Sequence, residues 1–282
     1  MRSYSGPISD YSAKLLSPFR YPGGKTWLVP LICQRLHNME SKPVEFIEPF
    51  AGGSIVGLNV AFRGLAEHVT LVELDEDVAA VWETIINGNA RSLADRIVAF
   101  NLTLDSVAEE LSKSPTDLED RAFQIILRNR ISRGGILAPG AGILRQGENG
   151  RGIKSRWYPE TLRKRILQVA EMRERITFIH GDGLDVLREN AQRADVVFFI
   201  DPPYTVGDKK PGRRLYTHYE IDHDELFRVA SMLTGNFLMT YSNDERVRRL
   251  ALRYNFDVRE ITMRNNHHIK KTELLIGRNL RE

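Results

Sequence analysis

The strongest chemical signal in this sequence is the tetrad Asp201-Pro202-Pro203-Tyr204, directly after the run of five apolar residues at 196–200. Such a run predicts a buried strand, and open α/β sheets bind ligands at the carboxyl ends of their strands. An aromatic amine is a poor nucleophile because its lone pair is delocalised into the ring. Two acceptors for its two N–H groups would hold the nitrogen pyramidal, with the lone pair available. We expect the Asp201 carboxylate and the Pro202 carbonyl to be these acceptors.

The other residues of the tetrad support this hypothesis. Pro202 and Pro203 stiffen the turn, so that the carbonyl of Pro202 is aimed at the substrate. Tyr204 offers a face on which an extruded base can stack. A proline turn after a strand is common in structural roles, but an acid-Pro-Pro-aromatic tetrad at this place is much rarer.

A glycine-containing turn follows an earlier predicted strand and opens a helix. Gly52 and Gly57 fit the pattern G-x-G-x-x-G, whereas Ser54 replaces its middle glycine. Glu73 lies 21 residues after Gly52, at the end of the next strand, where a carboxylate can accept both hydroxyls of a ribose. A helix-start carboxylate is the other interpretation, and it suits Asp75 better. Together these signals favour an adenosine-containing cofactor, without separating NAD from S-adenosylmethionine.

The segment 19–26 (FRYPGGKT) ends in Gly-Lys-Thr, like a phosphate-binding loop. The pattern G-x-x-x-x-G-K-[ST] would need glycine where Phe19 stands, and no strand clearly precedes the segment. We therefore reject a phosphate-binding loop here.

Short apolar strands alternate with amphipathic helices, which is typical of a mostly parallel sheet. The predicted strands are 44–47, 69–74, 176–180, 196–200 and 236–240, with a closing antiparallel hairpin at 256–264 and 272–276. The predicted helices of this core are 26–39, 54–63, 77–87, 184–189, 223–233 and 244–254. Between them, helical periodicity at 93–100, 118–131 and 159–172 surrounds a loop, 132–152, that holds seven glycines. We expect an α/β core, 1–90 and 176–282, interrupted by a mainly helical insert, 91–175.

Charge is unevenly distributed along the chain. The whole sequence carries +3, but the segment 121–175 has 13 Arg and Lys against 4 Glu and no Asp, which is +9 and leaves −6 for the rest. A surface for a polyanion and an Arg-rich solvated helix face explain this equally well.

Composition excludes several classes of protein. The single cysteine, Cys33, excludes an intramolecular disulfide and a thiolate zinc site, and we expect no metal. The N-terminus lacks an apolar stretch of signal-peptide length, and no apolar run is long enough to span a bilayer. We therefore expect a cytoplasmic protein with no membrane partner.

These motifs resemble the DNA adenine methylase family of the Dam and DpnII-type enzymes. In that family an aromatic-x-Gly-Gly-Lys element precedes an E-P-F-x-G motif, Asp-Pro-Pro-Tyr comes last, and the target-recognition segment lies in the middle. The stretches 240–243 (TYSN) and 271–276 (KTELLI) are also similar to family members. The resemblance covers about 18–277, and it implies a Rossmann-like methyltransferase fold, S-adenosyl-L-methionine as cofactor and double-stranded DNA as partner.

Site residues follow from the resemblance and the motifs together. The catalytic set is Asp201, Pro202, Pro203 and Tyr204. The cofactor-binding set is Tyr21, Gly24, Lys25, Glu48, Phe50, Gly52, Glu73, Asp182 and Asp201. Asp182 is expected at the cofactor adenine, although a helix N-cap explains it equally well. Ser54 and Glu73 depart from the residues most often found in the family, glycine and aspartate.

Basic residues of the insert are candidates for DNA phosphate contacts. They are Arg128, Arg130, Arg133, Arg151, Lys154 and Arg156, with Lys209 and Lys210 in the loop 208–214 after the tetrad. That loop can also be a solvated charge run. We further hypothesise that the glycine-rich loop 132–152 takes part in base readout.

The predicted reaction is direct in-line methyl transfer to the N6 nitrogen of a flipped-out adenine, without a metal or a covalent enzyme intermediate. Methylation at cytosine carbon 5 is disfavoured because no cysteine follows a proline as nucleophile. Cytosine N4, an RNA adenine and a glutamine amide remain alternative acceptors, although Asp rather than Ser or Asn at position 201 favours adenine. A non-catalytic DNA-binding subunit is the alternative from another class. A cognate restriction enzyme or a phage–host system is a possible further partner.

Overall fold

A mixed sheet organises the fold. The computed structural model describes residues 11–21, 23–138, 140–147, 150–203, 221–264 and 270–280. In this described part, seven strands form one sheet in the order β3-β2-β1-β4-β5-β7-β6. The strands β3 to β5 in this order are parallel, and β7 runs antiparallel between β5 and β6. The strands are β1 (Glu45–Glu48), β2 (His68–Glu73), β3 (Ile176–His180), β4 (Val196–Ile200), β5 (Asn236–Ser242), β6 (Asp257–Arg264) and β7 (Lys270–Gly277). The predicted sheet and its closing hairpin are confirmed.

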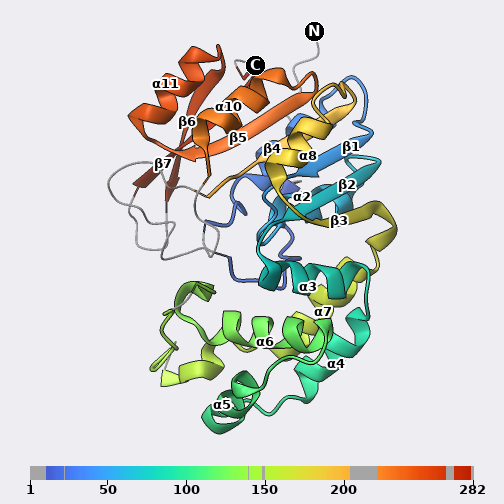
Figure 1. The fold of residues 1–282 in the computed structure, drawn as a ribbon, viewed down its shortest axis with the longest axis vertical. Coiled ribbons are helices and arrows are strands. Elements are labelled where there is room, and N and C mark those ends of the chain that lie inside the picture. Colours follow the sequence, from blue (N-terminus) through green and yellow to red (C-terminus); the bar gives the residue numbers. More distant parts are fainter. Residues whose placement is uncertain are drawn as a thin grey trace.

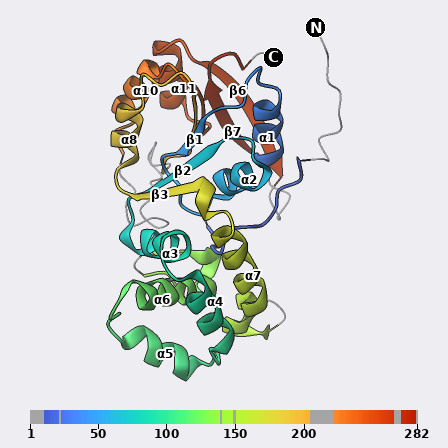
Figure 2. The same ribbon diagram turned by 90° about the vertical axis from the view of Figure 1, so that its right-hand side faces the viewer.

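Helices cover both faces of the sheet (Figure 1, Figure 2). In β4, Val197 and Phe199 enter the core on one face, whereas Phe198 and Ile200 enter the core on the other. Burial on both faces explains why this strand is a continuous apolar run. The first face is covered by α1 (Val29–His37) and α2 (Ile55–Arg63), and the second by α8 (Gly183–Glu189), α10 (His223–Met232) and α11 (Glu245–Arg253).

Two helices differ from the sequence prediction. The helix expected at 26–39 begins later, because residues 26–28 form turns and Pro30 stands in the first turn of α1. The helix α5 (Leu104–Ser112) is not predicted by periodicity, since Val107 is its one buried apolar residue. A capping box between Thr103 and Ser106 starts it instead.

A helical layer lies between α3 and β3 in the chain and beyond one edge of the sheet in space (Figure 1). Its helix α6 packs against α3, and α4 packs against α7. The helices predicted at 93–100, 118–131 and 159–172 are all present here. The layer consists of α4 (Ala90–Ala99), α5, α6 (Leu118–Ile131) and α7 (Pro159–Ala170). The helix α3 (Glu76–Ile86) precedes the layer in the chain.

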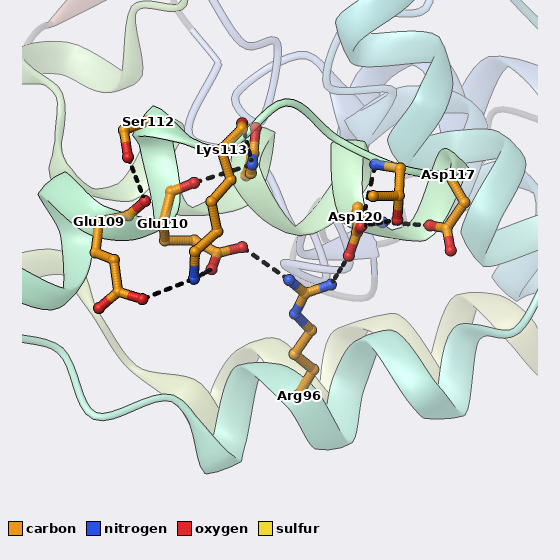
Figure 3. A network of polar contacts seen from close by, with 9 residues as sticks. Arg96, Glu109, Glu110, Ser112, Lys113, Asp117 and Asp120 are labelled. Carbon is orange, nitrogen blue, oxygen red and sulfur yellow. Dashed lines mark hydrogen bonds and ion pairs between the residues drawn. The ribbon is translucent and has the colours of Figure 1, made fainter.

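Arg96 ties three helices of this layer together (Figure 3). From α4 its guanidinium reaches Glu110 of α5 at 2.7 Å and Asp120 of α6 at 2.5 Å. Its carbon Cζ lies 4.2 Å from the ring centroid of Phe123, so the cation also packs on an aromatic face. A guanidinium with two carboxylates and one ring fixes the mutual placement of α4, α5 and α6.

We expect Arg96→Ala to lower the free energy of unfolding by about 1–2 kcal/mol, because two charge-assisted hydrogen bonds and a ring contact are lost from a side chain that is 32% exposed. Urea denaturation followed by circular dichroism measures this change. The matched control is Arg173→Ala. Arg173 pairs with Glu174, both side chains are exposed, and removing this ion pair should lower the free energy of unfolding by less than about 0.5 kcal/mol. Equal stability of the two variants would contradict the assigned role of Arg96.

Candidate active site

One cavity of about 490 Å³ lies at the carboxyl ends of β1, β2 and β4. Its volume is in the range of small-molecule and cofactor pockets. All nine residues predicted for cofactor binding line it, together with Pro202 and Pro203. Tyr204 lies outside the described residues. The motifs, far apart in the sequence, are therefore brought to a single site.

The ring of Tyr21 packs directly on the glycine turn after β1. A Cβ atom added at Gly52 would lie 2.6 Å from Cε1 of this ring, and one added at Gly53 would lie 2.8 Å from its Cβ. Gly52 also has φ of +46°, which favours glycine. The turn is thus closed by Tyr21 on one side, and this contact explains why two glycines stand in succession.

Ser54 takes the place of the missing glycine of the motif at a left-handed φ of +46°. Its Oγ donates a 2.7 Å hydrogen bond to Oε2 of Glu48, which also accepts the backbone N–H of Gly57 at 2.9 Å. Burial raises the pKa of Glu48 to about 8, against the lowering effect of these two donors. Glu48 lines the cavity, and the hydrogen bonds that it accepts from Ser54 and Gly57 stabilise the turn.

Glu73 is oriented by the backbone on both sides. Its Oε2 accepts the N–H of Gly52 at 2.8 Å, and its Oε1 accepts the N–H of Asp75 at 2.9 Å. Burial raises the pKa of Glu73 to about 7, although both N–H groups favour the ionised form. Asp75 caps α3 instead, accepting from Asp77 and Val78, as the helix-start interpretation predicts. The carboxylate at the tip of β2 is therefore fixed and faces the cavity.

Asp201 is held from two directions at the end of β4. Thr240 donates from Oγ1 to Oδ1 of Asp201 at 2.6 Å, and Nζ of Lys25 lies 2.9 Å from Oδ2. Lys25 is only 3% exposed and also donates to the carbonyl of Gly23 at 2.7 Å. Sequence reasoning placed Lys25 at the cofactor alone, whereas in the structure its ammonium pairs with the carboxylate of the tetrad.

Asp182 is the N-cap of α8, accepting the N–H of Leu184 at 2.8 Å. Its side chain is exposed and lines the cavity, so the capping role is present and the contact with adenine stays a prediction. The next residue, Gly183, lies against Pro49 so closely that an added Cβ would be 2.0 Å from the Pro49 carbonyl oxygen. This contact joins α8 to the glycine turn, and the sequence patterns do not predict it.

Two further site residues, Thr240 and Glu273, belong to the C-terminal stretches TYSN and KTELLI, to which the sequence assigned no role. Thr240 contacts Asp201, and Oε2 of Glu273 lies 3.8 Å from Nζ of Lys25. Thr240 is 1% exposed and Glu273 is 2% exposed. A buried polar residue in a strand is the signal that could have singled them out, but burial is not visible in one sequence.

The candidate DNA-contact residues differ in their exposure. Arg133, Arg151 and Lys154 are exposed, whereas Arg128 and Arg156 are half-buried. Lys209 and Lys210 lie outside the described residues.

Arg130 is 5% exposed and donates to the carbonyl of Pro18. Its guanidinium faces the interior, so we leave Arg130 out of the DNA contacts proposed below. Its neighbour Asn129 accepts from the N–H of Arg20 at 2.9 Å and donates to the Arg20 carbonyl at 3.0 Å. The end of α6 is thereby bound to the segment that carries Tyr21 and Lys25.

Two other kinds of site are absent from the described residues. Within those ranges, no three or more His, Cys, Asp or Glu side chains are grouped to hold a metal ion. No described helix combines the length and apolar character needed to cross a membrane.

The sheet order with its antiparallel β7, and a cavity that joins the buried carboxylate at the tip of β2 to an Asp-Pro-Pro turn, define a class I S-adenosylmethionine-dependent methyltransferase. The chain belongs to the D12 class N6 adenine-specific DNA methyltransferase family, whose model matches residues 21–266. It is accordingly an adenine-specific DNA methyltransferase with S-adenosyl-L-methionine as methyl donor, and the resemblance to the Dam family is confirmed.

The individual proteins that this chain resembles share no more than a quarter of their residues with it. The type II methyltransferase M.MjaIII of Methanocaldococcus jannaschii is 24% identical over 239 residues, covering 76% of this chain and 78% of that protein. Among solved structures, the rRNA methyltransferase aviRa from Streptomyces viridochromogenes aligns at 14% identity with a TM-score of 0.42, covering 97% of this chain and 94% of that one. A methyltransferase from Geobacter sulfurreducens aligns at 13% identity with a TM-score of 0.40, covering 92% and 80%.

We expect binding of S-adenosylmethionine to weaken as pH falls below about 7, the pKa of Glu73. Protonation removes acceptor capacity that the ribose hydroxyls require, so Kd should rise by up to roughly tenfold per pH unit. Calorimetric titration at several pH values measures this slope. Glu73→Gln should bind more weakly with a flatter pH dependence, and Glu67→Gln, at an exposed position, should behave as the wild type. An unchanged slope in Glu73→Gln would assign the titration to another group.

Proposed function

We propose that Asp201 and Pro202 hold the exocyclic amine of a flipped-out adenine in this cavity while it is methylated. The observation that supports this most is the fixation of the Asp201 carboxylate by Thr240 and Lys25 in the cavity that also contains Glu73. Such a carboxylate needs no rearrangement to accept an N–H group. The carbonyl of Pro202, next in the chain, would accept the second N–H, and Tyr204 would stack on the base.

The residues around the glycine turn fit S-adenosylmethionine. The carboxylate of Glu73, held by the N–H of Gly52, would accept the ribose hydroxyls, next to the turn where Tyr21 packs on Gly52 and Gly53. Asp182 lines the cavity wall beside Glu73 and would lie near the adenine. When bound, the cofactor supplies a methyl group on a sulfonium, which is already a good leaving group.

The remaining catalytic work is positioning and electrostatics. Asp201 would orient the amine toward the methyl carbon and then stabilise the positive charge that develops on nitrogen. No nucleophile of the protein has to form a bond. The acceptor alternatives, cytosine N4 and RNA adenine, would use the same geometry, so product analysis distinguishes them.

We further propose that the layer of α4 to α7 is the target-recognition segment for double-stranded DNA. Its exposed cations Arg133, Arg151 and Lys154 lie in or directly after the glycine-rich loop 132–152, where the N–H of Arg133 donates to the carbonyl of Gly142 at 2.9 Å. Extruding a base costs a few kcal/mol, which phosphate contacts and stacking would offset. Because the named relative is a type II methyltransferase, a restriction enzyme of the same specificity is the partner we propose.

Transfer of labelled methyl to unmethylated DNA, followed by nucleoside analysis, tests the assigned site. The wild type should form N(6)-methyladenine, and Asp201→Ala should lower kcat by about 10²-fold or more, because the acceptor for the amine is lost. Asp195→Ala, at the other end of β4 with a side chain 44% exposed, is the matched control and should retain activity. N(4)-methylcytosine as product, or full activity of Asp201→Ala, would contradict this assignment.

Removal of a phosphate contact has a distinct signature. Arg133→Ala should weaken DNA binding and lower the slope of log K against log salt by about 1, since one fewer counterion is released. Fluorescence anisotropy with a labelled duplex at several salt concentrations measures both quantities. Arg253→Ala is the control: its side chain is 65% exposed on α11, which packs against β6 at the other edge of the sheet, and its loss should leave both unchanged. An unaltered salt slope for Arg133→Ala would remove it from the interface.

A further inference from the structure

Glu273 occupies a costly position. It lies inside the sheet on β7, opposite Ser242 of β5 and Ile261 of β6, and is 2% exposed. The residue two positions on, Leu275, points to the same face and belongs to the core under α1 and α2. A carboxylate among such neighbours lowers stability unless a cation compensates it. Because Glu273 does not favour folding at this position, we look for its role in the reaction.

The cation near Glu273 is the one that also pairs with Asp201. Nζ of Lys25 lies 2.9 Å from Oδ2 of Asp201 and 3.8 Å from Oε2 of Glu273. One buried ammonium is thus shared by two carboxylates, and the formal charges of these three groups sum to −1. Asp201 lies closer, at hydrogen-bonding distance, while Glu273 acts on the ammonium at the longer ion-pair distance.

We infer that Glu273 is a positioning residue for methyl transfer: by sharing Lys25 with Asp201, it keeps the ammonium from neutralising the carboxylate that faces the amine. This inference rests on the function proposed above. A neutral Lys25–Asp201 pair would be a weak acceptor for an N–H group. With Glu273 present, the cluster retains a negative charge at the place where the substrate nitrogen becomes cationic.

During methyl transfer, the retained negative charge acts where the substrate nitrogen becomes positively charged. With S-adenosylmethionine bound, formation of the N–C bond would leave the electron pair of the S–C bond on sulfur, and the positive charge would pass to the adenine nitrogen. That nitrogen then loses one N–H proton, which Asp201 is placed to accept. Glu273 takes part in neither bond change; its charge acts through Lys25 on the acceptor of this proton.

Other charged or titratable groups surround the cluster. The buried carboxyl of Glu48 interacts with both Asp201 and Lys25, and the hydroxyl of Tyr241 interacts with Asp201. The hydroxyl oxygen of Tyr241 in turn lies 2.8 Å from Nδ1 of His223, at the start of α10. None of these residues is altered in a Glu273 variant, so a change in the pH profile reports the loss of the Glu273 charge from the cluster.

Glu273→Gln tests the inference, because it removes the charge and keeps the shape. We expect kcat to fall on the order of 10- to 100-fold, with KM for DNA and for S-adenosylmethionine within about threefold of the wild type. The pH profile of kcat should change as well, because a charge has been removed next to the reacting groups. Glu260→Gln, an exposed change in the same hairpin, is the control and should leave kcat and its pH profile unaltered.

A double-mutant cycle separates this role from a purely structural one. If Glu273 acts through Lys25, Glu273→Gln should cost nothing further in a Lys25→Met background. An equal loss in both backgrounds, or unchanged kcat and pH profile in Glu273→Gln alone, overturns the inference. Thermal denaturation and cofactor titration verify that the variants fold. Should Glu273→Gln not fold, Glu273→Asp withdraws the charge by one methylene, and full kcat in that variant is then the overturning result. Absence of N(6)-methyladenine from the wild type would instead refute the proposed function.

Discussion

The ion pair between Lys25 and Asp201 is the contact on which the rest of the site depends. Lys25 comes from the turn before α1, and Asp201 comes from the end of β4. The pair can form only where the sheet face covered by α1 meets the carboxyl ends of the strands. Because both side chains are largely buried, their separation is fixed by packing and not by solvent. The cavity, the glycine turn and the C-terminal hairpin are all arranged around this point.

Much of the fold follows from local patterns in the sequence. The apolar run of β4 and the alternation of strands with amphipathic helices predict a doubly covered sheet, because each pattern fits one period and one environment. The glycine turn and the acidic tip of β2 predict a nucleoside site for the same reason, since the ligand needs small residues and one carboxylate. These predictions depend on neighbours in the chain, which a sequence displays directly.

Other features depend on contacts between distant segments, and the sequence does not display them. The second partner of Lys25 is Glu273, on a strand near the other end of the chain. Ser54 departs from the glycine pattern, and the structure gives the reason: its hydroxyl donates a hydrogen bond to Glu48. Arg130 belongs to a basic segment yet faces inward, because its guanidinium binds the carbonyl of Pro18. Composition cannot separate an inward arginine from an exposed one.

The place of β7 between β5 and β6 has a consequence for how the protein comes into being. Glu273 reaches the site only after the antiparallel hairpin has entered the sheet, so its contact with Lys25 forms only once the chain has been synthesised past residue 273. Contacts this far apart in sequence form late in folding because they close the longest loops. A nascent chain still on the ribosome would already possess its glycine turn and its Asp-Pro-Pro turn. The charge balance of its active site would be completed last.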